Sequence, residues 1–145
     1  MNAMLVHLHS GLRWIVLLLV VAATVNALLK WRGNKSLGQN DQRLNLFAMT
    51  SVHIQFLIGI ILYFISGKVS FESGFMSNAA TRFFTIEHAL MMIIGVALIS
   101  IGYSRAKRMT EDSAKFKTIF IFYLIGLLVI LSRVPWPGMH GTGWG

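Results

Sequence analysis

Residues 4–29, MLVHLHSGLRWIVLLLVVAATVNALL, form a long apolar run whose titratable side chains, His7, His9 and Arg13, all lie in its first half. An α-helix rises about 1.5 Å per residue, so about 20 apolar residues cross a hydrocarbon core of about 30 Å. The run therefore predicts a membrane-spanning helix. Residues 30–32, KWR, follow it in place of a small-residue cleavage site, so we expect it to stay attached rather than act as a signal peptide.

Three more apolar runs follow, at residues 46–66, 83–103 and 118–134. The segments between them are short, which makes consecutive helices run in opposite directions. The prolines just beyond residue 134 predict the end of the fourth helix. The sequence thus predicts an all-α integral membrane protein. We expect a single domain over residues 1–145, folded as an antiparallel up-down-up-down four-helix transmembrane bundle.

The composition supports this class of protein. Hydrophobic residues make up 55% of the chain and charged residues only 12%, against about 25% charged in soluble domains. The net charge of +8 comes mostly from residues that flank the apolar runs, so we expect no nucleic-acid partner. The chain has no cysteine, which excludes disulfides, thiolate-bound iron–sulfur clusters, cysteine zinc sites and covalently attached c-type haem.

The basic residues predict the orientation. Cytoplasmic loops are enriched in lysine and arginine, and nine of the thirteen cations lie in or beside the first and third connecting segments. These nine are Lys30, Arg32, Lys35, Arg43, Arg105, Lys107, Arg108, Lys115 and Lys117. We therefore expect a multi-pass protein of the inner (cytoplasmic) membrane with the N- and C-termini outside.

Ionisable side chains inside a span are costly and usually mark a site in the interior of a bundle. His9 and Arg13 are four residues apart and share one helix face, which continues through small residues that favour close helix packing. His88 lies in the third run and His53 in the second. The chain directions place His9 and His88 in the outer half of the membrane. His53 lies nearer the midplane, roughly 10 Å from His88 along the membrane normal.

Two neutral imidazoles from different helices are what a b-type haem needs for axial ligation. We therefore predict His9, His88 and His53 as candidate ligands of a haem or metal, and Arg13 as the partner of a haem propionate. The alternative is that each histidine only hydrogen-bonds a neighbouring helix. Glu87 either orients His88 or pairs with Arg13 or Arg82.

Glycine and methionine leave further alternatives open. Gly95, two helical turns beyond His88 on the same face, either leaves room for a flat ligand or lets two backbones pack closely. Histidines and methionines near the outer face offer soft ligands for copper. These are His7, His9, His88, His140, Met1, Met4, Met91, Met92 and Met139.

The strings HLHSGLRW, HIQFLIG, RFFTIEHALMM and the terminal PWP resemble small four-span membrane proteins described as cytochrome b-like, similar in layout to the copper-resistance D and SirB-type families. The resemblance covers most of the chain. It implies a b-haem between helices, with His9, His53 and His88 at the matching positions. The chain lacks two clear pairs of histidines, so the resemblance does not extend to a two-haem wire.

These observations give three functional hypotheses. The first is a b-type haem protein that transfers electrons, between membrane quinol and a membrane or periplasmic redox partner at the outer face. The second is copper or other metal handling, and the third is a cofactor-free accessory subunit of a membrane complex. The sequence has no nucleophile with an adjacent base, phosphate loop or HExxH motif, so we expect an electron carrier or subunit rather than a stand-alone enzyme. It leaves the oligomeric state open.

Overall fold

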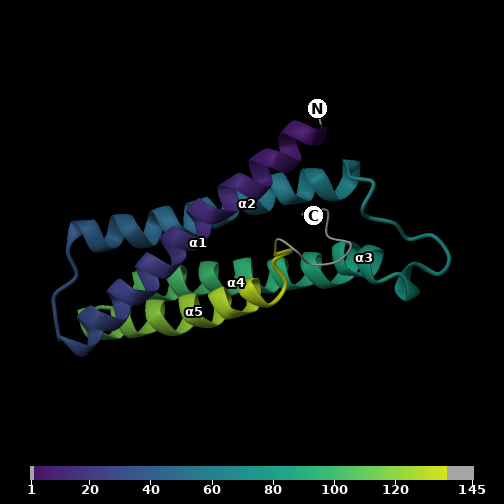
Figure 1. Ribbon diagram of the computed structural model, residues 1–145. Helices are drawn as coiled ribbons and strands as arrows, with labels where there is room; N and C mark the ends of the chain where they lie inside the picture. Colours follow the sequence, from purple (N-terminus) through teal and green to yellow (C-terminus); the bar gives the residue numbers. More distant parts are fainter. Residues whose placement is uncertain (1, 137–145) are drawn as a thin grey trace.

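The computed structural model describes residues 2–136, whose regular secondary structure is helical throughout (Figure 1). Its long helices are α1 (Asn2–Arg32), α2 (Gln39–Ile65), α4 (His88–Arg108) and α5 (Asp112–Ser132). A four-residue helix, α3 (Ala79–Arg82), and a π-helical turn, η2 (Phe83–Glu87), lead without a break into α4. The four helical stretches that contain these elements are each long and apolar enough to cross a membrane.

The helices extend beyond the apolar runs, mostly at the basic end of the bundle. The second helix begins at Gln39 rather than at residue 46, and the third continues to Arg108 rather than to residue 103. The fourth begins at Asp112, six residues before residue 118. The reason is that hydropathy marks the hydrocarbon core, whereas a helix continues into the headgroup region wherever its polar residues keep helical geometry.

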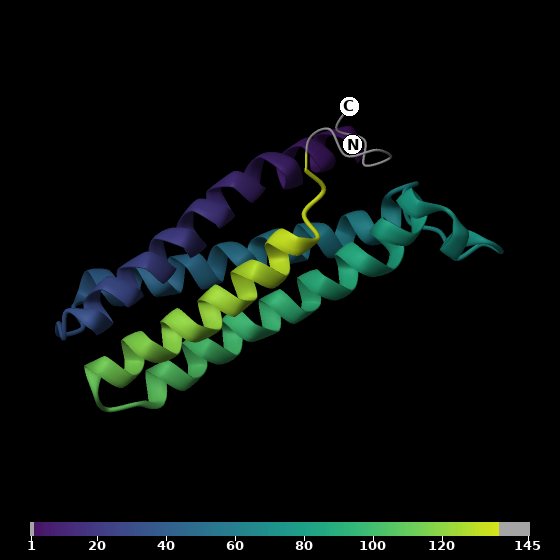
Figure 2. The ribbon, with the colours of Figure 1, turned by 60° about the horizontal axis from the view of Figure 1, so that its bottom comes forward.

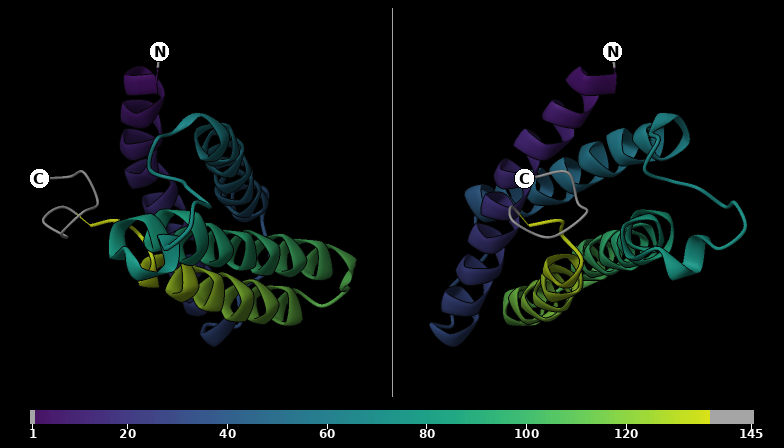
Figure 3. Two further views of the ribbon diagram at one scale, coloured as in Figure 1. Left: turned by 90° about the vertical axis from the view of Figure 1, so that its right-hand side faces the viewer. Right: turned by 45° about the vertical axis from the view of Figure 1, so that its right-hand side comes forward.

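The four long helices pack antiparallel as a bundle (Figure 2). The most extensive contacts join α4 with α5, and α1 contacts both α2 and α5. The direct contact between α2 and α4 is much smaller. Two views show that the C-terminal end of α1 lies close to α5, whereas the N-terminal end of α1 diverges from it (Figures 2 and 3). The bundle is therefore tight at its basic end and splayed at the opposite end.

Glycines explain the close contact of α4 with α5. A Cβ added at Gly95 would lie 2.5 Å from Cγ1 of Ile130 and 3.3 Å from the carbonyl oxygen of Gly126. At Gly102 an added Cβ would overlap Phe122. Gly95 is therefore a packing residue. The alternative that it leaves room for a flat ligand is wrong, because the Ile130 side chain fills that space.

A small core holds the tight end together, and most other apolar side chains lie on the outside. On α1, beyond His9 and Arg13, the side chains of Val20, Ala23 and Ala27 are buried, at most 1% exposed. By contrast Leu18 is 68% and Phe64 80% exposed. Soluble monomers rarely expose such large apolar surfaces, whereas lipid covers them. The fold is thus that of a multi-pass membrane protein with four candidate spans, as the sequence predicts.

A buried carboxylate fastens the first connecting segment. Asp41 is 3% exposed; its Oδ1 accepts hydrogen bonds from Asn26 at 2.9 Å and from Lys30 at 2.7 Å. Its Oδ2 accepts from the backbone N–H of Gly38 at 2.8 Å, which satisfies a donor at the start of α2. These bonds join the end of α1 to the beginning of α2.

Candidate functional site

A cavity of about 840 Å³ lies at the splayed end of the bundle. Its walls come from the N-terminal half of α1, the C-terminal half of α2, the start of α4 and the end of α5 with the residues that follow it. Most of the lining is apolar. The polar side chains that converge on it include His9, Arg13, Gln55 and His88. Ligand sites in proteins commonly combine an apolar cavity of this size with a few such groups.

His9 and His88 are neighbours in this cavity. Their ring centroids are 6.4 Å apart and the ring planes are nearly perpendicular, at 86°. His9 comes from the second turn of α1 and His88 from the first residue of α4. The structure therefore brings together two of the three histidines predicted as ligands, from two different spans.

The His9 ring is seated against a glycine of α2. A Cβ added at Gly59 would lie 3.2 Å from Cε1 of His9, so the ring occupies space that a larger residue would take. One turn earlier, the Gln55 side chain donates a hydrogen bond to the His9 carbonyl oxygen at 2.8 Å. Among residues 2–136, none hydrogen-bonds the buried Nδ1 atom of His9. The sequence analysis did not predict the contacts of Gln55 and Gly59 with His9.

The His88 ring is held by a backbone carbonyl. Its Nδ1 lies 2.8 Å from the carbonyl oxygen of Arg133, just beyond α5. A carbonyl oxygen only accepts, so Nδ1 carries the hydrogen, and in the neutral imidazole Nε2 is then the atom with a free lone pair. The ring also stacks on Phe83, with centroids 5.9 Å apart and planes 24° apart.

The π-helical turn η2 immediately precedes His88. Its wider winding places the His88 backbone N–H on the carbonyl oxygen of Phe83, five residues earlier. The carbonyl oxygen of Thr85 accepts a hydrogen bond from the Tyr63 hydroxyl at 2.8 Å, and the Thr85 hydroxyl bonds the backbone of Ser70. These bonds tie the turn to the end of α2 and to the segment after it. Single π turns of this kind often occur at functional sites.

Arg13 also reaches the cavity. It is 7% exposed, its Nη1 donates to the carbonyl oxygen of Pro135 at 3.4 Å, and its guanidinium lies 5.0 Å from the ring centroid of Trp14. It lies one turn of α1 beyond His9, as the spacing in the sequence predicts. Arg13 thus adds a positive charge to the wall of the cavity.

Glu87 does not reach the His88 ring nitrogens, because Arg133 takes Nδ1 and because Glu87 itself is ion-paired. Its Oε2 lies 3.0 Å from Nε of Arg82, and its Oε1 lies 3.3 Å from Nε of Arg133. Pairing with Arg82 was one of the alternatives from the sequence. The second pair, with Arg133, links the start of α4 to the residue whose carbonyl holds His88.

His53 lies elsewhere. It is exposed on α2 and its Nε2 is 2.7 Å from the hydroxyl oxygen of Ser100. Ser100 follows His88 by twelve residues along α4, which is roughly 18 Å of helix. The expected separation of about 10 Å along the membrane normal stays a prediction. The three predicted histidines thus do not converge, and His53 does not line the cavity.

The remaining soft ligands are only partly described. Met92 lines the cavity beside His88, and exposed His7 lies at its edge. Met1, Met139 and His140 lie outside the described residues. Within residues 2–136, no three His, Cys, Asp or Glu side chains are grouped so that they could hold a metal ion.

Comparison with known proteins gives no identity for this chain: no protein-family model, curated protein or solved structure matches it.

Proposed function

We propose that this protein binds one b-type haem between His9 and His88 and uses it to transfer electrons at the membrane. The observation that carries the proposal is the spacing of the two rings across the cavity. A metal–imidazole nitrogen bond is about 2.0 to 2.1 Å long, so one metal between two imidazoles leaves their ring centroids roughly 6 Å apart. The ring centroids here are 6.4 Å apart.

The surroundings of both ring nitrogens support axial ligation. A metal-binding histidine usually donates its other ring N–H to a carbonyl or carboxylate, which fixes the tautomer and orients the ring. The carbonyl of Arg133 does this for Nδ1 of His88 and leaves Nε2 as the ligand atom. On His9, a buried ring nitrogen lacks a partner within residues 2–136, which is the kind of group that a bound ligand satisfies.

The rest of the cavity fits the other parts of a haem. Apolar side chains from four helices line most of it and suit the flat macrocycle. Arg13 lines the cavity, and its guanidinium would bind a propionate there. When bound, the haem would supply one-electron redox chemistry. The chain would supply the axial ligands, a low-dielectric surrounding and the counter-charge for a propionate.

Location and partners complete the proposal. The concentration of cations at the other end of the bundle supports an orientation in which the cavity lies in the outer half of the inner membrane, with both termini outside. From this depth a haem would accept electrons from quinol in the bilayer and pass them to a redox protein at the outer face. His53 then serves to link α2 with α4 through Ser100, and the protein carries a single haem.

Copper binding is the second candidate function, and one observation favours it. Met92 lines the same cavity as His9 and His88, and a thioether with two imidazoles suits Cu(I). The proposed site would then hold a copper ion in place of the iron of a haem. Both candidates use the same two histidines but predict different spectra.

A pyridine haemochrome assay on protein purified from membranes with haem-replete growth tests the proposal. The expected result is one b-type haem per chain. Copper in stoichiometric amount without a Soret band would favour the second candidate. Protein that assembles with neither group, and stays without haem after incubation with hemin, would overturn both and leave the accessory-subunit hypothesis.

A further inference from the structure

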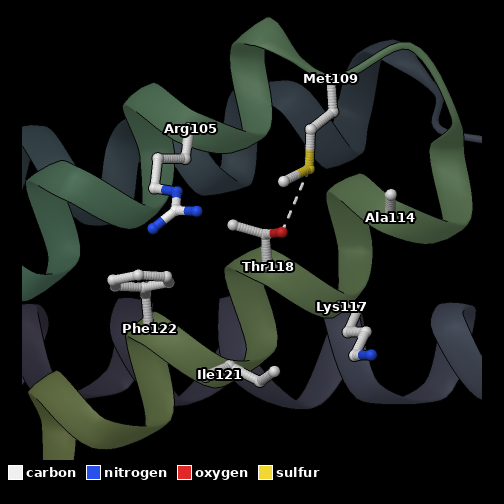
Figure 4. Close-up of a pocket in the computed structure, with 7 residues that line it drawn as sticks. All are labelled: Arg105, Met109, Ala114, Lys117, Thr118, Ile121 and Phe122. Carbon is white, nitrogen blue, oxygen red and sulfur yellow. Dashed lines mark hydrogen bonds between the residues drawn. The ribbon is translucent and has the colours of Figure 1, made fainter.

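A second hollow, of about 320 Å³, lies between α4 and α5 at the basic end of the bundle (Figure 4). Arg105 stands on its α4 side, and Lys117 and Thr118 come from α5, with Thr118 between the two cations in the view. Ile121 and Phe122 form its apolar part. We call this hollow the basic groove. His9 and His88 do not line it, and it plays no part in the proposed haem site.

Local packing builds the basic groove. Gly102 lets Phe122 pack directly on the α4 backbone, and the Arg105 guanidinium lies 5.6 Å from the centroid of the Phe122 ring. The Thr118 hydroxyl donates to the Met109 sulfur at 3.2 Å, which holds the end of α4 against α5. The arginine head is thus positioned by an aromatic ring rather than by a carboxylate.

The cations of the basic groove lie against aromatic rings. Within residues 2–136, neither Arg105 nor Lys117 forms an ion pair with a carboxylate. The aromatic contact of Lys117 is with Trp31, whose ring centroid is 5.8 Å from Nζ. Asp112, which begins α5, instead accepts a hydrogen bond from the backbone of Leu37. Both cations are therefore available to an anion from outside the protein.

The depth of the basic groove matches the headgroup layer. On α4 the apolar run ends at residue 103, two residues before Arg105, and on α5 it begins at residue 118, directly after Lys117. Trp31, a residue type typical of the membrane interface, lies at the same level. If the two cations bind the charged end of an amphipathic molecule, its apolar part would therefore extend toward the membrane core along Ile121 and Phe122. Ile121 is 38% exposed.

We propose that the basic groove binds the phosphodiester headgroup of an anionic phospholipid, with an acyl chain along the α5 surface. Basic pockets between transmembrane helices are known binding sites for anionic headgroups. Arginine provides paired N–H donors to phosphate oxygens, and lysine provides a mobile ammonium. The apolar floor favours a lipid over a free phosphate, because a soluble anion gains nothing from Ile121 and Phe122.

Native mass spectrometry of the purified full chain tests this site, with dioleoyl phosphatidylglycerol and dioleoyl phosphatidylcholine as probes. The test variant is the double replacement Arg105→Gln with Lys117→Gln. The matched control is Lys107→Gln with Lys115→Gln, which removes the same charge from the same region but from residues outside the groove. Lys117→Gln alone serves as a second test that keeps the Arg105–Phe122 contact.

The proposal predicts that wild type and the control retain phosphatidylglycerol in preference to phosphatidylcholine. The double test variant should bind phosphatidylglycerol roughly tenfold or more weakly, because it loses two hydrogen-bonding charged groups. The affinity of the single variant Lys117→Gln for phosphatidylglycerol should lie between those of wild type and the double test variant. Equal losses in control and test variants would show diffuse attraction and overturn the site. If soluble glycerol phosphate displaced bound phosphatidylglycerol as effectively as the lipid itself does, the assignment to a lipid would be overturned.

Discussion

His9 of α1 is seated directly on Gly59 of α2, with no side chain between the imidazole and the α2 backbone. An added Cβ at Gly59 would lie 3.2 Å from the ring, tight enough to displace it by a few tenths of an ångström. Because Gly59 has no side chain, the His9 ring can occupy the position in which it faces His88.

Gly59→Val should therefore displace the His9 ring and reduce bound haem. Overpacking of this kind costs about 1–3 kcal/mol, which we expect to appear mainly as weaker haem binding. Haem content per chain, measured after purification, checks this. Gly11→Val is the matched control, because a Cβ at Gly11 meets nothing within 4 Å of the described chain. Equal haem loss in both variants would contradict the role of Gly59.

Arg13→Gln should weaken haem binding and lower its midpoint potential. The variant loses a charge-assisted hydrogen bond to a propionate, worth about 1.5–3 kcal/mol. The potential falls because a nearby positive charge favours the reduced haem, which carries one positive charge fewer than the oxidised haem. Redox titration of membranes and the rate of haem transfer to an acceptor protein measure both effects. Arg13→Lys keeps the positive charge, so its midpoint potential should lie close to that of wild type. An unchanged midpoint potential in Arg13→Gln would show that Arg13 is not near the haem.

Asp41→Asn should destabilise the basic end without affecting the haem spectrum. The carboxylate accepts three hydrogen bonds while nearly fully buried, and loss of its charge weakens each of them. The expected cost is about 1–3 kcal/mol. Thermal unfolding in detergent should show a lower Tm. Glu111→Gln, an exposed acidic residue near the same end, should leave Tm unchanged, and a similar drop there would argue against a specific role for Asp41.

The sequence was sufficient for the architecture because burial in lipid imposes one strong constraint. Each span needs a continuous apolar run, and these four runs are present. The ends of the helices were not predictable in the same way. Polar stretches such as residues 39–45 and 104–108 remain helical outside the apolar runs, and hydropathy gives no signal for that.

The candidate site was only partly predictable. The spacing of His9 and Arg13 along one helix fixed their shared face, and chain direction placed His9 near His88. For His53 the sequence left open a ligand role or a hydrogen bond to a neighbouring helix, and the structure shows such a bond, to Ser100. Two other features of the site had no signal in the sequence, because both are properties of the backbone rather than of side chains. They are the π-helical turn before His88 and the Arg133 carbonyl that holds the His88 ring.

The most direct test of the account compares absorption and EPR spectra of three single variants, His9→Ala, His88→Ala and His53→Ala. The account predicts a low-spin, bis-histidine haem in wild type and in His53→Ala, because His53 bonds Ser100 rather than the cavity. His9→Ala and His88→Ala should each lose haem or convert it to a high-spin form with one axial ligand. A low-spin spectrum that survives loss of His9 or His88 but disappears with His53 would contradict the assignment of the ligands.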